Sequence, residues 1–164
     1  MDGAAGLIFS KDKKQILLIK RRDVPVWDLP CGGRNVNESP EDCVIREVFE
    51  ETGFNVSVIR LVAIYNNTWK RGNCIHSYIC EIVGGEKRVS DESKEVEYHD
   101  VLNLPHLKTL FVDQFIEDAL KEDKAVIKAD LKKIPLSFFV TESLKHPIVA
   151  LRYFLVYNGI HINT

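Results

Sequence analysis

Residues 38–51 constrain the fold of this chain more than any other segment, because they specify both ends of a helix. They read ESPEDCVIREVFEE, with six acidic residues and one basic residue, Arg46, in a chain whose formal net charge is only −2. Ser39 is a preferred N-cap residue, Pro40 suits the first helical position, and Gly53 is a frequent C-terminal stop. We therefore predict a helix that begins at Pro40 and ends before Gly53.

The predicted helix has two chemically different faces. At about 100° per residue its apolar side chains fall on one arc, which we expect to face the core. These side chains are Val44, Ile45, Val48 and Phe49. Glu47, Glu50 and Glu51 fall on the opposite arc, at a spacing where like charges weaken a helix by about 0.2–0.5 kcal/mol per pair. A bound Mg²⁺ or Mn²⁺ would explain this cluster, because both cations take oxygen ligands, and a solvated acidic face is the alternative.

The residues around the acidic cluster extend the pattern in both directions. The order is Gly32, five residues, Glu38, seven residues, Arg46-Glu47-Val48, one residue, Glu50-Glu51, one residue, and Gly53-Phe54. This arrangement resembles the signature box of the Nudix hydrolases, with every specified position filled. The preceding residues 27–32, WDLPCG, are similar to the family's usual approach to the box. A looser resemblance runs from the N-terminus to about residue 120.

This resemblance implies a fold and a reaction. The implied fold is an α/β/α sandwich with a mixed β-sheet, in which the box forms a loop, a helix and a turn. The implied reaction is hydrolysis of a pyrophosphate bond in a nucleoside diphosphate linked to another group. Divalent cations, usually Mg²⁺ with Mn²⁺ as a substitute, would be held by the box carboxylates. The chemistry agrees, because bound metal ions activate water and neutralise phosphate charge.

The resemblance also implies roles for individual box residues. Glu47, Glu50 and Glu51 would be metal ligands, and Glu47 and Glu50 would belong to the catalytic group. Arg46 would orient a box carboxylate, and Glu38 would support the loop or hold a metal-bound water. The residues alone favour this role for Arg46, because its pairing with Glu50 has the less stabilising Arg-first order.

One cysteine departs from the family pattern. Many members have glycine where this chain has Cys31. A backbone carbonyl of this turn often joins the metal ligands, and Cys31 can supply one because every residue has a carbonyl. An exposed Cys31 thiol would be open to oxidation. Cys74, His76 and Cys80 share one face of a predicted strand, where we expect buried small side chains, with a metal site as the alternative.

Outside the box, several residues are candidates for contact with an anionic nucleotide. Arg21 and Arg22 end a predicted strand and could face the substrate, or could simply be solvated. Trp69 and Lys70 lie at the tip of a predicted loop, where an aromatic ring beside cations could stack on a base. A Trp69 side chain folded back on the sheet is the alternative.

A further acidic segment follows at residues 91–98. It is similar to the family's loop before a late short strand, where several members place an additional catalytic or metal-binding glutamate. Glu92 matches that position best and Glu95 second. A solvated loop acid is the alternative for each.

The remaining elements follow from hydrophobic periodicity. Strands are predicted over residues 3–9, 15–20, 56–65 and 74–83, and helices over residues 108–121 and 147–157. Residues 122–135 are mostly charged and are predicted to be a surface connection. We expect one domain over residues 1–164, in which residues 122–164 are a C-terminal helical extension. Its apolar helix is predicted to be buried on the domain or to pack on a partner subunit, as in a homodimer.

Charge and hydropathy bear on the binding partners and the cellular location that we expect. A net charge of −2 gives no reason to expect nucleic-acid binding. No apolar run approaches the roughly 18 residues of a membrane span, and the first residues do not resemble a signal peptide. We therefore expect a cytoplasmic protein that binds a small-molecule nucleotide.

The substrate class is open at this stage. ADP-ribose-cleaving Nudix members tend to carry a proline about fifteen residues past the box, and this chain has none at residues 67–70. A nucleoside triphosphate is therefore the first expectation, with ADP-ribose or another nucleotide sugar as the alternative. A Nudix-fold nucleotide sensor without catalysis is a second alternative. Such sensors commonly lose box carboxylates, which are complete here.

Overall fold

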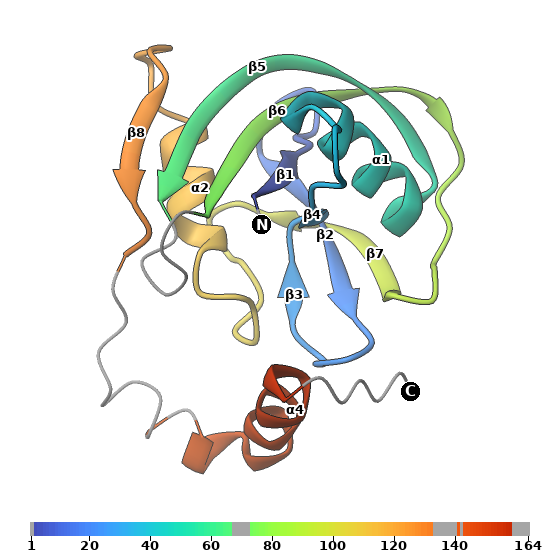
Figure 1. Cartoon of the computed structure of the whole chain (residues 1–164), viewed down its shortest axis with the longest axis vertical. Coiled ribbons are helices and arrows are strands. Elements are labelled where there is room, and N and C mark those ends of the chain that lie inside the picture. The colour runs from blue at the N-terminus through green and yellow to red at the C-terminus, as the bar shows by residue number, and fades with distance from the viewer. Residues whose placement is uncertain (1, 67–72, 133–140, 142, 159–164) are drawn as a thin grey trace.

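The computed structural model describes residues 2–66, 73–132, 141 and 143–158, and it combines strands and helices (Figure 1). The strands are β1 (Gly3–Leu7), β2 (Gln15–Arg21), β3 (Trp27–Asp28), β4 (Cys31–Gly33), β5 (Phe54–Asn66), β6 (Cys74–Gly85), β7 (Ser93–Asp100) and β8 (Ile127–Asp130). The helices are α1 (Pro40–Thr52), α2 (Val112–Ala119) and α4 (Pro147–Tyr157).

The described strands form two sheets. One has the order β4-β1-β6-β5-β8 and the other the order β3-β2-β7. In the larger sheet β1 runs parallel to β6, whereas β5 runs antiparallel to β6, so the sheet is mixed as predicted. At its edge, β4 pairs with β1 and sets Gly32 opposite Ala4. This pairing fixes the loop that leads into α1.

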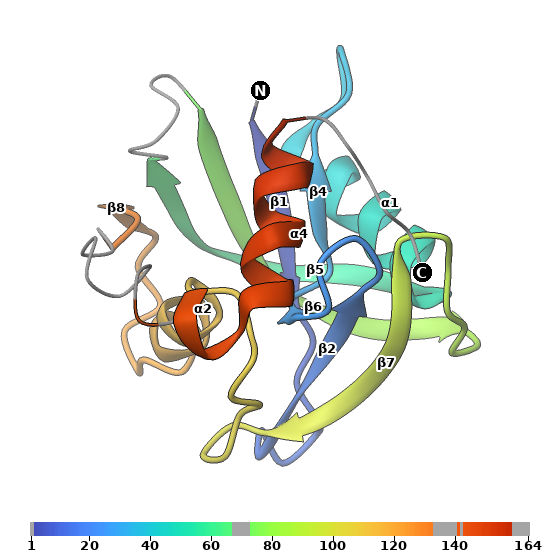
Figure 2. The ribbon, with the colours of Figure 1, turned by 90° about the horizontal axis from the view of Figure 1, so that it is seen from below.

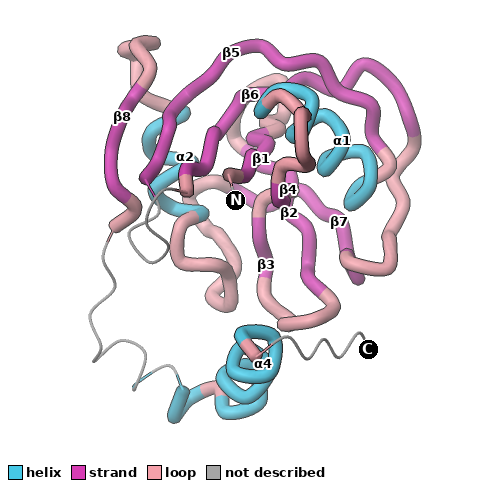
Figure 3. The backbone as a smooth tube through the Cα atoms, viewed as in Figure 1, coloured by secondary structure: helices cyan, strands magenta, loops and turns pink. Residues whose placement is uncertain are grey.

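Helices cover both faces of the larger sheet, as the tube in Figure 3 shows. On one face Val44 and Val48 of α1 are fully buried in a cluster with Tyr78 of β6. On the other face Phe115 of α2 packs against Tyr65 of β5, with ring centroids 4.4 Å apart. The α/β sandwich expected from the sequence is therefore confirmed.

Helix α1 has the ends that its sequence predicts. The Ser39 side chain accepts a hydrogen bond from the Asp42 N–H at 3.0 Å, which satisfies a free donor of the first turn. Gly53 ends the helix with φ of 80°, and its N–H donates to the Phe49 carbonyl at 2.9 Å. This left-handed conformation favours glycine, because other side chains are strained there.

Two predicted elements differ from the structure because tertiary pairing decides them. The charged segment 122–135 contains β8, which adds a parallel strand to β5 by setting Ile127 opposite Ala63. Helix α2 begins at Val112 rather than at residue 108, because the chain before it is bound to β3. There the Thr109 N–H donates to the Trp27 carbonyl at 2.8 Å.

Helix α4 forms where predicted, but it is not buried. The side chains of Ile148, Leu151 and Phe154 are 69%, 58% and 64% exposed. The helix lies beside the turn between β2 and β3 (Figure 2), where Arg152 Nη1 donates to the Arg22 carbonyl at 3.0 Å. These exposures do not fit the first alternative, a helix buried on the domain, and packing on a partner subunit stays a prediction. Among the described residues, no helix has the length and apolar character needed to cross a membrane.

Candidate active site

The loop at Gly32, called the box loop, packs against the acidic face of helix α1, called the box helix. Gly32 on β4 passes directly over the Glu47 carboxylate, and a Cβ at Gly32 would overlap that group. Only glycine allows this close approach of backbone and carboxylate. The loop therefore covers part of the acidic face of α1, and the Glu47 and Glu51 side chains become buried there, with residue exposures of 7% and 4%.

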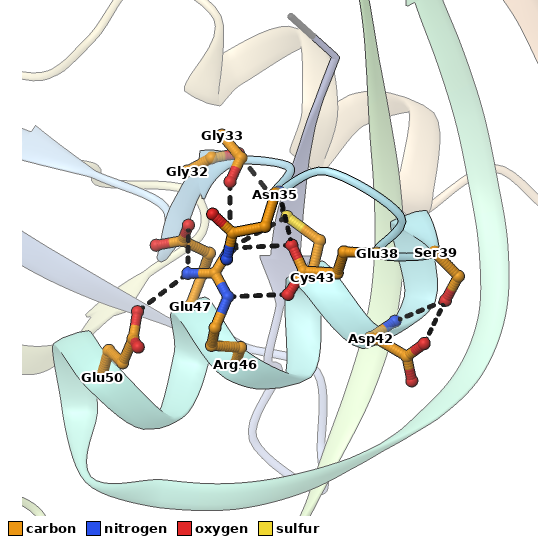
Figure 4. A network of polar contacts seen from close by, with 10 residues as sticks. All are labelled: Gly32, Gly33, Asn35, Glu38, Ser39, Asp42, Cys43, Arg46, Glu47 and Glu50. Atoms are coloured by element: carbon orange, nitrogen blue, oxygen red, sulfur yellow. Dashed lines mark hydrogen bonds and ion pairs between the residues drawn. The ribbon is translucent and has the colours of Figure 1, made fainter.

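Arg46 joins three of the box carboxylates (Figure 4). Its Nε and Nη2 donate to the two Glu38 carboxylate oxygens at 2.7 and 3.0 Å. Its Nη1 donates to Glu47 at 2.7 Å and to Glu50 at 2.8 Å. Nη2 also donates to the Gly33 carbonyl at 2.9 Å, so the side chain ties the loop to the helix. These are the contacts that an orienting residue needs.

Glu38 holds the loop in place. Hydrogen bonds from Arg46 and then from the Asn35 N–H stabilise its charged form and lower its pKa to about 2. The Asn35 N–H lies 2.8 Å from Glu38 Oε2. This geometry fits loop support, and a contact through a metal-bound water stays a prediction.

Burial and neighbouring carboxylates disfavour the charged forms of Glu47 and Glu51. Burial raises the pKa of Glu47, contacts with Arg46 lower it, and the nearby Glu50 and Glu92 raise it again. Burial raises the pKa of Glu51 far more, and the nearby Asp28 and Glu47 add to this rise. A hydrogen bond from the Cys31 N–H at 2.8 Å partly offsets it. A cation at this place would relieve the repulsion.

The residue types at the site fit a hard divalent cation, because carboxylate oxygens are its preferred ligands. Within the described part of the chain, however, no three Asp, Glu, His or Cys side chains converge on one point as metal ligands would. Arg46 holds Glu47 and Glu50, and the Cys31 N–H holds Glu51. Binding an ion would thus require these carboxylates to exchange their present partners.

Asp28 is a site residue that sequence reasoning missed. Its side chain is 13% exposed, and its Oδ1 accepts hydrogen bonds from Thr109 Oγ1 at 2.6 Å and the Leu29 N–H at 2.8 Å. Burial raises the pKa of Asp28, an effect that Thr109 and Arg21 partly offset. No regular spacing links Asp28 to the helical carboxylates. The only signal was its place in the approach to the box.

The two arginines predicted to contact substrate are engaged within the protein. Arg21 forms a forked ion pair with Asp23, at 2.9 and 2.6 Å, and lies 3.8 Å from an Asp28 oxygen. Arg22 Nε donates to the Ser90 carbonyl at 2.8 Å. Arg21 thus borders the carboxylate cluster, whereas Arg22 faces a different loop. The other two predicted contacts, Trp69 and Lys70, lie outside the described residues.

The structure separates the two candidate glutamates of residues 91–98. Glu92 is exposed and lies close enough to Glu47 to contribute, after burial, to the raised pKa of that carboxyl. Glu95 instead forms an ion pair with Lys20 Nζ at 2.8 Å, across the β2–β7 ladder. The predicted loop is largely strand β7, because β2 supplies a pairing partner that the local sequence does not reveal.

All four cysteines are free thiols. Cys43 and Cys80 are buried, and Cys31 and Cys74 are half-buried. Burial raises the pKa of Cys43 to about 11 and that of Cys80 to about 12. No metal-binding group containing Cys74, His76 and Cys80 forms among the described residues.

Comparison with known proteins settles the family. The sequence model of the NUDIX domain matches residues 2–119. The chain belongs to the Nudix family. The match covers the box and all the strands except β8, and it ends at the last residue of α2, so β8 and α4 lie beyond it.

Relatives of this Nudix protein carry several names. The chain is 40% identical over 106 residues to an ADP-ribose pyrophosphatase of Methanocaldococcus jannaschii, covering 61% of this chain and 62% of that protein. It is 39% identical over 82 residues to a Bacillus subtilis protein provisionally named 8-oxo-dGTP diphosphatase, covering 50% and 54%. The chain therefore spans less than two thirds of the length of these relatives.

Solved structures agree on the fold. A crystal structure of an ADP-ribose pyrophosphatase from Streptococcus suis superposes with a TM-score of 0.64 at 28% sequence identity. The match covers 77% of this chain and 96% of that chain. A UDP-X diphosphatase, at 20% identity and a TM-score of 0.66, shows the same fold.

Proposed function

We propose that this protein is a divalent-cation-dependent hydrolase, which cleaves a pyrophosphate bond in a nucleoside diphosphate linked to another group. The observation that carries the proposal is the complete box, folded so that Arg46 gathers Glu38, Glu47 and Glu50 beneath the loop at Gly32. A solvated acidic face would need neither this burial nor this network. The names of the relatives support the same reaction class.

The proposed metal site uses the residues predicted from the sequence. Glu47, Glu50 and Glu51 would hold Mg²⁺ or Mn²⁺, with the Cys31 carbonyl as a further ligand and Glu38 acting through a water. Such an ion supplies an activated water and neutralises phosphate charge. When the ion is bound, Arg46 would orient the box carboxylate that stays hydrogen-bonded to its guanidinium. Arg21, at the edge of the cluster, is the nearer of the two predicted arginines to a bound phosphate.

In this proposal an exposed carboxylate accepts the proton of the attacking water. A general base must reach the attacking water and have a pKa that suits its task. Glu51 is held by the Cys31 N–H and is nearly fully buried. Glu50, whose side chain is 56% exposed, and the exposed Glu92 are therefore the candidates.

Two substrate classes have support. The missing proline at residues 67–70 and the name of the B. subtilis relative favour a nucleoside triphosphate. The ADP-ribose pyrophosphatase names, and a Klebsiella pneumoniae GDP-mannose pyrophosphatase at 27% identity over 137 residues, favour a nucleotide sugar. Products separate them, since a triphosphate releases phosphate or pyrophosphate and a nucleotide sugar releases a nucleoside monophosphate and a sugar phosphate.

The test combines a substrate panel with one substitution. Nucleoside triphosphates and nucleotide sugars are incubated with the protein and Mg²⁺, and products are separated by chromatography. Glu50→Gln should lower kcat by about 10²- to 10⁴-fold with the fold intact. Glu117→Gln is the matched control, because Glu117 is an exposed glutamate of α2 paired with Lys132. Tight nucleotide binding without turnover would instead favour a sensor.

A homodimer and a cytoplasmic location also remain proposals, which rest on the sequence. So does the division into one domain with residues 122–164 as its extension. Light scattering of the purified chain would test the first of these, because a homodimer has twice the mass of the 18.8 kDa chain.

A further inference from the structure

The turn that carries Glu92 is attached to the box helix. This turn, residues 90–93, precedes β7 and is called the Glu92 turn below. Ser93 is fully buried, and its Oγ donates a hydrogen bond to the Glu51 carbonyl at 2.6 Å. Carbonyls in the last turn of a helix have no partner within the helix. Ser93 therefore satisfies a free acceptor of α1 and joins the turn to the end of that helix.

A second attachment comes from Arg22, the residue that follows β2. The Arg22 N–H donates to the Glu92 carbonyl at 2.9 Å, and Arg22 Nε donates to the Ser90 carbonyl at 2.8 Å. The turn is thus held from two sides by elements distant in sequence. The guanidinium contact is charge-assisted, and such bonds are stronger than neutral ones.

The Glu92 turn is also closed by its own serines. Ser90 Oγ accepts hydrogen bonds from the N–H groups of Glu92 and Ser93, at 3.1 and 3.0 Å. The Ser90 N–H donates to Ser93 Oγ at 3.0 Å. Ser93 therefore takes part in both the internal closure and the attachment to α1, which makes it the central residue of the turn.

These contacts fix where an exposed carboxylate can reach. Glu92 itself is exposed, and its place at the tip of a short turn would leave it free to sample many positions. Ordering one backbone residue costs about 1–2 kcal/mol, and a catalytic group that is misplaced by an ångström loses much of its effect. The attachments supply that order before substrate arrives, and they hold Glu92 at the end of α1, within reach of the charge of Glu47.

We propose that Ser93 and Arg22 are positioning residues, which hold the Glu92 turn against the end of helix α1 and so keep Glu92 at the edge of the box carboxylates. The catalytic consequence rests on the proposed function, whereas the attachment itself does not. This assignment gives Arg22 a different task from the substrate contact expected from its sequence position. Its guanidinium acts on the loop, and its effect on catalysis passes through Glu92.

A double-mutant cycle tests the coupling. The four proteins are the parent, Ser93→Ala, Glu92→Gln and the double variant, and kcat and KM are measured for each. Ser93→Ala should lower kcat about tenfold with KM within about twofold, and should lower it no further in the Glu92→Gln background. An equal loss in both backgrounds, or no loss in either, would overturn the proposal. Ser77→Ala, a fully buried serine of β6, is the control.

Amide hydrogen exchange tests the attachment without any substrate. Exchange in residues 90–93 should be at least about tenfold faster in Ser93→Ala than in Ser77→Ala, measured under conditions where unfolding is rare. Arg22→Ala should also speed amide exchange in residues 90–93. This variant alone tests the attachment if Ser93→Ala does not fold. Unchanged exchange in the variants that fold would sink the proposal. If no nucleotide is cleaved, faster exchange would still support the attachment, and only the proposed function would fail.

Discussion

At the scale of single residues, the site depends on the shape of Arg46 as much as on its charge. Three carboxylates and the Gly33 carbonyl surround one planar guanidinium, with five donor contacts between 2.7 and 3.0 Å. A lysine has the same charge but three donors on a flexible stem, so it cannot reproduce the fork. A lysine at position 46 would keep the positive charge and lose the donor geometry, so this substitution separates the two effects.

Arg46→Lys is accordingly predicted to keep the fold and lose most of the activity. We expect kcat to fall about tenfold or more, because Glu47 and Glu50 lose a shared donor that fixes their positions. Circular dichroism and steady-state kinetics on the substrate found by the panel would measure both effects. Arg60→Lys is the control, since Arg60 Nη2 donates to the Ala119 carbonyl far from the box. Equal kcat values in the two variants would contradict the orienting role.

Thiol reactivity gives a second prediction at this scale. Burial raises the pKa of Cys31 well above its ordinary value, and raises those of Cys43 and Cys80 to about 11 and 12. Because the thiolate is the reactive form, iodoacetamide at pH 7.5 should modify Cys74 first. Peptide mass spectrometry over time would give the order. Earlier modification of Cys31 would show that the box loop opens readily in solution.

Individual residues differ in how far the sequence predicts their place. The carboxylates of the box were found from their spacing, because helical periodicity puts them on one face. Asp28 and Ser93 were missed, since their partners lie 81 and 42 residues away and no local pattern connects them. Arg22 was given a substrate contact because its charge is visible in the sequence, whereas its hydrogen-bond partner Ser90 is not.

At the scale of elements, local sequence signals determine some helices and strands, and tertiary pairing determines others. Helix α1 was predicted at both ends, because Ser39 and Gly53 act on the backbone of their own helix. Strand β8 was missed, because four alternating residues form a strand only where β5 offers an edge. The sequence leaves open whether α4 is buried on the domain or packs on a partner subunit, since an apolar composition does not say what covers the helix.

The C-terminal cap of α1 allows a sharp test of stability. Gly53→Ala should lower the free energy of unfolding by more than about 1 kcal/mol, because alanine is strained at φ of 80° and its Cβ would overlap the Glu86 carbonyl. Urea unfolding followed by fluorescence would measure the change. Gly84→Ala is the matched control, because a Cβ there meets only Asn55 Nδ2, at 3.7 Å. Similar losses in both variants would remove the cap argument.

At the scale of the whole molecule, a nearly neutral chain has concentrated its acids in one place. The formal net charge is −2, yet Glu51 is buried, and the nearby Asp28 and Glu47 add to the rise that burial gives its pKa. Burying like charges costs free energy that the rest of the fold must offset. The two arginines at the edges, Arg21 and Arg46, compensate only part of this repulsion. A divalent cation would supply the rest, so metal binding and folding stability should be coupled.

Mg²⁺ is therefore predicted to stabilise the whole protein, and not only to activate it. A ligand that binds the folded state alone at a hundred times its Kd adds about 2.7 kcal/mol, which for a chain of this size raises Tm by roughly 5–10 °C. Differential scanning fluorimetry in EDTA and in rising Mg²⁺ would measure the shift. NaCl at equal ionic strength controls for simple screening of the charges.

The variants decide whether such a shift comes from the box. Glu50→Gln removes a proposed ligand and should reduce the Mg²⁺-induced rise in Tm, whereas Glu117→Gln on α2 should leave it unchanged. If magnesium raises Tm equally in both variants, the ion acts elsewhere on the acidic surface. If it raises Tm in neither the parent nor the variants, Glu47, Glu50 and Glu51 form no metal site, and the two arginines, Arg21 and Arg46, must balance their charge.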